Sequence, residues 1–118
     1  MYFKQAFIAS VAVLSPAVLG NITCETTDGS PEIADVTDVI NYLNGHAGTF
    51  EPDIYASSKC RTVANVGSAA VAMCGDEGYS GTDLGKDALD IQNECLNDGR
   101  VGGTKHLDNG DRIEVIHS

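Results

Sequence analysis

The chain has 118 residues, with 7 Lys and Arg against 17 Asp and Glu, a formal net charge of -10 and a pI near 4.4. This length fits one domain and excludes a large multidomain enzyme. So acidic a chain lacks the positive surface that binds phosphate backbones, and no nucleic-acid partner is expected. With 3 Phe, 4 Tyr and no Trp, its core is predicted to need support beyond apolar burial.

Residues 1–20 have the pattern of a secretory signal peptide. Lys4 precedes a nearly unbroken apolar stretch over residues 6–14, and Pro16 and the small Gly20 follow. The alternative, a membrane anchor, would need about 20 apolar residues. We therefore expect cleavage before Asn21 and a secreted, extracellular protein without a stable membrane anchor. The mature chain would start with Asn21-Ile22-Thr23, a predicted N-glycosylation site at Asn21.

The cysteines all lie in the expected mature chain: Cys24, Cys60, Cys74 and Cys95. An even number of cysteines in a short exported chain predicts two disulfides. A zinc site is the competing use of such residues, but no two cysteines have the short spacing of a zinc knuckle. Neither a metal nor a cofactor is expected.

In the first half of the mature chain, residues 21–25 predict a strand that ends at the turn 27–29. Ser30 is suited to cap a helix that has Pro31 in its first turn, and Asn44-Gly45 predicts a left-handed stop. Apolar residues at three- and four-residue steps predict this helix over residues 31–44: Ile33, Val36, Val39, Ile40 and Leu43. Residues 45–58 show no sustained period and are predicted to be a loop.

In the second half, residues 59–66 and 69–74 predict two strands. A three-residue turn at 66–68 would place Cys60 directly opposite Cys74. Thr82 or Ser80 can cap a second helix, whose apolar stripe is Leu84, Ala88, Ile91 and Cys95 and which ends at Asn97-Asp98-Gly99. Residues 101–107 are weakly extended, 108–111 predict a turn, and 113–115 predict a closing strand.

This order predicts an α+β fold for a single disulfide-stabilised domain over residues 21–118. Two helices would pack on one face of a four-stranded antiparallel sheet, in the split βαβ, ferredoxin-like arrangement. The second helix would then end near the first strand, which favours Cys24–Cys95 together with Cys60–Cys74. The alternative connectivity, Cys24–Cys74 with Cys60–Cys95, remains open.

Candidate catalytic residues are few. His106, Arg112 and Glu114 would lie on adjacent strands, where a small secreted hydrolase such as a fungal ribonuclease could use a His opposite a Glu with an Arg nearby. Such residues are also typical of a solvated hairpin, and no motif fixes their positions. The sequence has no Gly-x-Ser-x-Gly elbow, and no cysteine is expected to remain as a nucleophile. An enzyme is therefore not expected.

Acidic residues follow the apolar stripe of the second helix at helical spacing: Asp83, Asp87, Asp90 and Glu94. They predict a solvated face, and a calcium site or a cationic partner is the alternative. The run Asp108-Asn109-Gly110-Asp111 lacks the ligand ladder of a calcium loop and predicts a tight hairpin turn.

Three aromatic residues, Phe50, Tyr55 and Tyr79, fall in the two longest predicted loops. Aromatic rings on loops of a rigid scaffold are typical of a protein-binding surface. The alternative is that they fold back as lids over the sheet edges. The loop 45–58 is also long enough to serve as the inhibitory loop of a protease inhibitor.

Four segments carry a resemblance to a known group of proteins: 35–43, 60–75 with its Gly-Ser-Ala-Ala-Val-Ala-Met-Cys-Gly run, 87–95 and 100–103. In spacing and residue character the chain resembles small secreted fungal proteins, among them the killer toxins of smut fungi and the necrosis-inducing effector family. The resemblance implies an exported, non-enzymatic α+β protein that acts on a competing microbe or a host plant through a surface target. We therefore expect a secreted interaction protein, with a small acidic hydrolase or a protease inhibitor as alternatives.

Overall fold

The computed structural model describes residues 18, 19 and 21–118 of the chain. Apart from residues 18 and 19, the expected signal peptide over 1–20 lies outside the described residues. The helices are α1 (Ile33–Asn44) and α2 (Gly81–Cys95). The strands are β2 (Val18–Leu19), β3 (Ile22–Cys24), β4 (Thr49–Phe50), β5 (Cys60–Val66), β6 (Ala69–Cys74), β7 (Tyr79–Ser80), β8 (Gly103–His106) and β9 (Arg112–His117).

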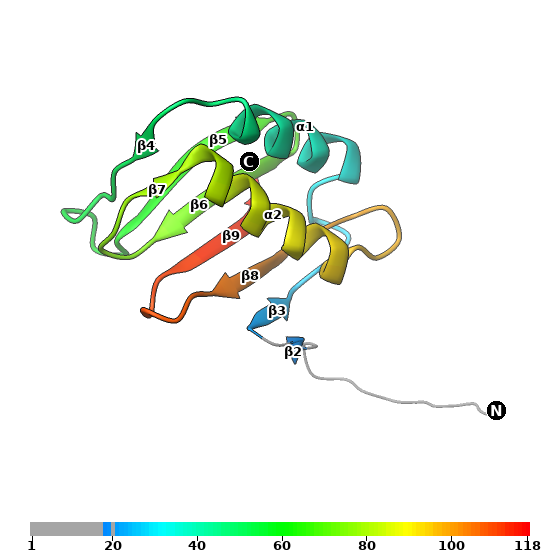
Figure 1. Cartoon of the computed structure of the whole chain (residues 1–118). Helices are drawn as coiled ribbons and strands as arrows, with labels where there is room; N and C mark the ends of the chain where they lie inside the picture. The colour runs from blue at the N-terminus through cyan, green and yellow to red at the C-terminus, as the bar shows by residue number, and fades with distance from the viewer. Residues whose placement is uncertain (1–17, 20) are drawn as a thin grey trace.

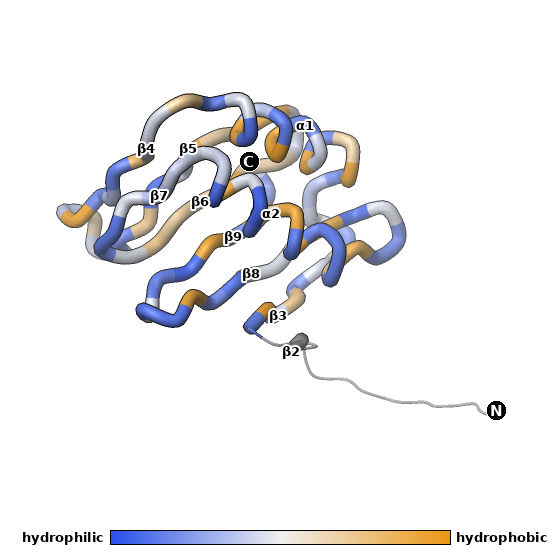
Figure 2. The backbone as a smooth tube through the Cα atoms, in the orientation of Figure 1, coloured by the Kyte–Doolittle hydropathy of each residue, from blue (hydrophilic) through white to orange (hydrophobic). Residues whose placement is uncertain are grey.

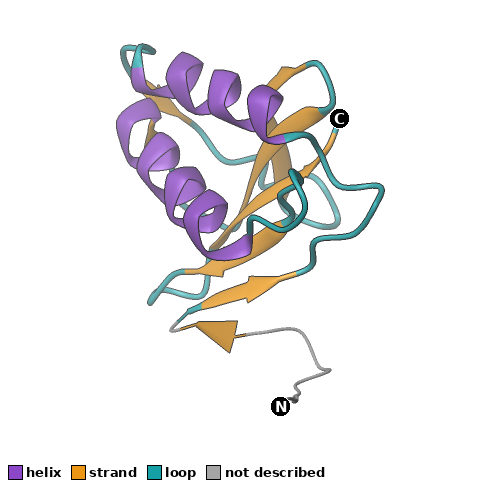
Figure 3. Cartoon of the chain, turned by 90° about the vertical axis from the view of Figure 1, so that its right-hand side faces the viewer, coloured by secondary structure: helices purple, strands orange, loops and turns teal. Residues whose placement is uncertain are grey.

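The main sheet is antiparallel throughout and has the order β2-β3-β8-β9-β6-β5. Both helices lie on one face of this sheet (Figures 1 and 3). The predicted α+β class, with two helices on one face of an antiparallel sheet, is confirmed. The sheet has more than the four predicted strands, because the C-terminal region folds as a complete β8–β9 hairpin and β9 lies between β8 and β6.

The hydrophobic core lies between the helices and the sheet. Its fully buried side chains include Val36, Val39 and Leu43 of α1, Leu84, Ala88 and Ile91 of α2, and Val71, Ile113 and Val115 of the sheet. The apolar stripes predicted for the two helices are therefore their buried faces. A glycine lets the helices approach closely, because a Cβ on Gly81, the first residue of α2, would strike the backbone oxygen of Leu43 in α1.

The ends of α1 differ from the prediction. Ser30 is not the cap: its buried hydroxyl accepts a hydrogen bond from the Thr27 amide, 2.9 Å away, while Glu32 starts the helix without a side-chain cap. Gly45 has a right-handed φ of -88°, so the predicted left-handed stop is wrong. The chain instead continues into another turn, in which the His46 amide donates to Leu43 O. At α2 the Ser80 cap is confirmed, since its Oγ accepts from the Asp83 amide at 3.0 Å.

The β5–β6 hairpin reaches the predicted cysteine pairing by a different route. Its turn contains two residues, Gly67 and Ser68, because Val66 pairs with Ala69, and Gly67 has a positive φ of 54°. The predicted three-residue turn is therefore wrong. A β-bulge between Thr62 and Ala64 shifts the register by one residue and still brings Cys60 opposite Cys74.

The structure contains two disulfides, Cys24–Cys95 and Cys60–Cys74, so all four cysteines are paired. This confirms the favoured connectivity. Cys24–Cys95 joins the end of α2 to β3 on the inner side of the sheet. Cys60–Cys74 joins neighbouring strands at one end of the β5–β6 hairpin.

Candidate functional site

The predicted catalytic residues His106, Arg112 and Glu114 lie on the outer face of the sheet, away from the helices. Ile113 and Val115 are buried in the core, so their neighbours on β9 point to the opposite face. His106 pairs with Arg112 across β8 and β9, and Arg112 Nε donates to Glu114 Oε2 at 2.8 Å. Among the described residues, none forms a hydrogen bond with the His106 ring. The strands thus bring the three residues to one face without joining His106 to Glu114.

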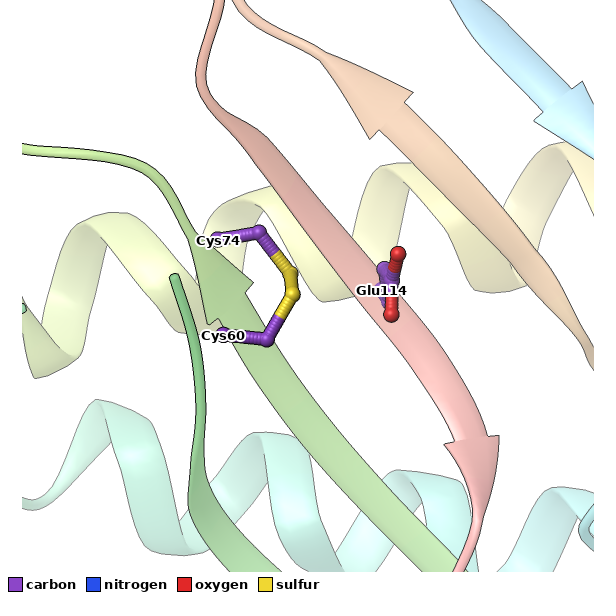
Figure 4. Close-up of side chains that lie close together, drawn as sticks. All are labelled: Cys60, Cys74 and Glu114. Atoms are coloured by element: carbon purple, nitrogen blue, oxygen red, sulfur yellow. A yellow bond between two sulfur atoms is a disulfide. The ribbon is translucent and has the colours of Figure 1, made fainter. Parts of the chain in front are cut away.

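The Cys60–Cys74 disulfide lies on the same outer face, beside Glu114 (Figure 4). One carboxylate oxygen of Glu114 and the two sulfur atoms lie within 4.8 Å of one another. A metal would require the cysteines as thiolates, and both sulfurs are held in a disulfide. In this oxidised form the cluster does not supply a set of metal ligands.

Two of the three aromatic residues singled out in the sequence are packed against the domain. The Phe50 side chain is 8% exposed, and its ring stacks on His46 with a centroid distance of 4.4 Å. Phe50 pairs with Tyr79 across β4 and β7, a second, two-stranded sheet. Phe50 is therefore buried and Tyr79 half-buried against the core, within a small sheet that the sequence did not predict. Sequence patterns cannot find β4 and β7, because a two-residue strand has no period.

Tyr55 is instead 94% exposed, and the neighbouring Ile54 is 51% exposed. Both belong to residues 51–59, here called the tip loop, which lies between β4 and β5. The tip loop extends past the end of the main sheet (Figure 1), and its tip is an apolar segment in a mostly polar stretch of the chain (Figure 2). An aromatic and an aliphatic side chain therefore face solvent next to each other at one end of the molecule.

Local hydrogen bonds hold the tip loop in shape. Asp53 Oδ1 accepts from the amides of Tyr55 and Ala56, both at 3.2 Å, and the Lys59 amide donates to Ala56 O at 3.0 Å. Arg61 donates to Glu51 O at 2.7 Å. Cys60, fixed by its disulfide, follows the loop directly. Contacts of this kind restrict the backbone under the exposed side chains, and a restricted loop loses less entropy when a partner binds.

At the same end of the molecule, Asp111 links the 108–111 turn to the segment before α2. Its carboxylate is buried and accepts from the amides of Asp76 and Glu77, each at 3.3 Å, and from the Tyr79 hydroxyl at 2.7 Å. Burial raises the pKa of Tyr79, and the hydrogen bond and negative charge of Asp111 raise it further. The predicted 108–111 turn is present, with a positive φ of 93° at Gly110. No pattern in the sequence predicted that Asp111 of this turn would hold the 75–78 loop in place.

The acidic stripe of α2 is not simply a solvated face. Lys105 Nζ, on β8, lies 2.8 Å from Asp87 and 2.7 Å from Asp90. Burial alone would lower the pKa of Lys105, but its hydrogen bonds to Asp87 and Asp90 and their charges outweigh this effect and raise the pKa. The cation that these carboxylates bind therefore comes from the same chain. Asp83 and Glu94 remain exposed.

Asn21, the predicted glycosylation site, is exposed at the start of the domain. Its backbone oxygen accepts a hydrogen bond from the His106 amide at 2.8 Å, which leaves the side-chain amide outside this contact.

No protein-family model matches the chain, and no curated protein matches it either. Over the residues that the structure describes, neither helix combines the length and the apolar character needed to cross a membrane. Inference about function therefore depends on the geometry described above.

Proposed function

We propose that this protein is a secreted, non-enzymatic interaction protein, of the effector or killer-toxin kind, that binds a protein or cell-surface target outside the cell through the tip loop. The observation that carries the proposal is the near-complete exposure of Tyr55, 94%, on a loop whose backbone is fixed by Asp53.

Tyrosine suits this role for a physical reason. Its ring offers a large, rigid contact area with few rotatable bonds, so little conformational entropy is lost when a partner covers it. A fully exposed ring contributes almost nothing to the stability of the isolated domain. The 51% exposed Ile54 adds apolar surface beside it. These two side chains thus supply the apolar centre that a binding surface needs.

Export is supported by two features of the chain. Residues 1–20 have the charged start, apolar stretch and small final residue of a signal peptide. The two disulfides are typical of proteins that fold in an oxidising compartment. The resemblance to secreted fungal toxins and effectors points to a host plant or a competing microbe as the source of the target.

The alternatives fit the geometry less well. A protease binds its substrate as an extended segment, whereas residues 54–58 of the tip loop form consecutive turns. The hydrolase alternative needs Glu114 next to a histidine, and no hydrogen bond joins the His106 ring to Glu114 among the described residues. Both features favour recognition by a folded loop tip.

The test is a binding experiment with the labelled mature protein on intact plant cells and on fungal cells. Tyr55→Ala is expected to weaken binding by about 2 kcal/mol, roughly 30-fold, without changing the unfolding midpoint. Tyr42→Ala is the matched control, because Tyr42 is also exposed, at 52%, but lies on α1. Equal binding by both variants and the unmodified protein would exclude the tip loop as the recognition element.

A further inference from the structure

On the outer face of the sheet, a positively charged side chain lies beside a disulfide. Arg112 lies directly opposite Cys74 in the β6–β9 pairing, and its Nη2 atom is 3.5 Å from Cys60 Sγ. The same guanidinium donates through Nε to Glu114, 2.8 Å away, which fixes its orientation. A guanidinium beside a disulfide stabilises negative charge on a neighbouring sulfur, and the cross-strand pairing places Arg112 beside Cys74 as well. The Glu114 carboxylate, within 4.8 Å of both sulfurs, offsets part of this effect, so the direct contact from Arg112 Nη2 is what favours a thiolate when the disulfide is opened.

Solvent reaches the two sulfurs of this disulfide unequally. Cys74 lies in a fully buried strand and is 3% exposed, whereas Cys60 is half-buried on the edge strand β5. A nucleophile from solvent therefore meets Cys60 first.

The Cys24–Cys95 disulfide has a different environment. Cys95 is 3% exposed and belongs to the core, and its sulfur would lie only 2.9 Å from a Cβ on Gly103. This disulfide thus lacks the access found at Cys60, and among the described residues no cation donates a hydrogen bond to either of its sulfurs.

We propose that Cys60–Cys74 is a thiol-exchange site for a thiol of low molecular mass, with Cys60 as the attacked sulfur and Arg112 as the charge-stabilising group. The incoming thiolate forms a bond to Cys60 Sγ while the Cys60–Cys74 bond breaks. The electron pair of the broken bond stays on Cys74 Sγ, which becomes a thiolate opposite Arg112. The product is a mixed disulfide on Cys60, and no other oxidant or reductant is required.

The test treats the folded, oxidised protein with reduced glutathione near neutral pH, quenches with acid, alkylates the free thiols and maps each cysteine by mass spectrometry. The glutathione adduct is expected on Cys60, with Cys74 alkylated. Cys60–Cys74 is expected to open at least about tenfold faster than Cys24–Cys95, because exposed disulfides exchange faster than buried ones.

Three variants separate the role of Arg112 from a general effect of charge or folding. Arg112→Gln is expected to slow the exchange about fivefold, the effect of one partly exposed charge, and Arg112→Lys to restore most of the rate. Lys59→Gln removes a neighbouring positive charge that pairs with Asp76 rather than with the sulfur, so its rate should stay close to that of the unmodified protein. Circular dichroism checks that each variant is folded.

Several results would overturn the proposal. They are an adduct on Cys24 or Cys95 before one on Cys60, equal slowing by Arg112→Gln and Lys59→Gln, or failure of Arg112→Lys to restore the rate. Faster opening of both disulfides in Arg112→Gln would show that Arg112 only stabilises the fold, and would also overturn it.

Discussion

The two disulfides hold two regions of the molecule in different ways. Cys24–Cys95 spans 71 residues and joins the end of α2 to β3, so it ties a helix to the sheet through the core. Cys60–Cys74 spans 14 residues and joins adjacent strands on the outer face, directly after the tip loop. The first link holds the two layers together, and the second fixes the base of the surface that we assign to recognition. We therefore expect the first link to contribute more to global stability and the second to the shape of the proposed recognition surface.

The largest expected effect is the loss of the core link. In the chain-entropy description, a disulfide that closes so long a loop contributes about 4 kcal/mol, which is a large part of the stability of a small domain. We expect Cys24→Ala with Cys95→Ala to lower the free energy of unfolding by about this amount, measured by urea unfolding under non-reducing conditions. An unchanged unfolding midpoint would contradict the assignment of this link to the core.

Loss of the outer link should cost less. The shorter loop closed by Cys60–Cys74 corresponds to about 3 kcal/mol, and Cys74, although 3% exposed, does not belong to the core cluster between the helices and the sheet. We expect Cys60→Ala with Cys74→Ala to remain folded, with hydrogen exchange increasing mainly over residues 51–62. If exchange rose equally across α2 and β3, the two links would not serve separate regions.

A substitution at Asp111 tests a single polar contact at the end of the molecule that carries the tip loop. Asp111→Asn keeps the shape of the side chain but removes the charge that accepts from the Asp76 and Glu77 amides and from the Tyr79 hydroxyl. We expect a loss of about 2 kcal/mol in the free energy of unfolding, since hydrogen bonds to a buried charged group are among the stronger ones. Asp108→Asn, in the same turn but exposed, is the matched control and should change the unfolding free energy little.

The smallest expected effect concerns acid. The amide and hydroxyl of Ser68 both donate to Asp35, at 2.8 and 2.7 Å, and lower its pKa below the ordinary 3.8. The ionised form of Asp35 thus stabilises the fold above its unfolded pKa, and this contribution is lost as the pH falls through the lowered value. Urea unfolding between about pH 5 and about pH 2 should show a shallower acid loss in Asp35→Asn than in the control Asp38→Asn. If the two variants lost stability with falling pH in the same way, the Ser68–Asp35 hydrogen bonds would not contribute to acid sensitivity.

Sequence patterns predicted the parts of the fold in which apolar residues recur at regular spacing. Both helices and the two strands of the β5–β6 hairpin followed from apolar spacing and β-forming residues, the Ser80 cap from its residue type, and the favoured disulfide pairing from the order of the elements. The start of α1 did not, because Glu32 and Ile33 are fixed by contacts with Arg100 and Gly99, about 70 residues away. Long-range pairing of this kind leaves no local pattern.

The candidate site was harder to predict for the same reason. Phe50 and Tyr55 are both aromatic residues of one predicted loop, but only Phe50 has a cross-strand partner, Tyr79, and a ring to stack on. Whether a loop residue is buried depends on such partners, which composition does not reveal. The Lys105 ion pairs show the same limit, because the partners of that lysine lie on α2.

The most direct test of the central claim, that this is an exported and oxidised binding module, is the intact mass of the protein recovered from the medium of cells expressing the full chain. We expect a protein that starts at Asn21 and is lighter than the fully reduced form by four hydrogen atoms, as two disulfides require, apart from any glycan on Asn21. A protein retained in the cells with residues 1–20 attached, or a secreted protein with free thiols, would contradict the claim.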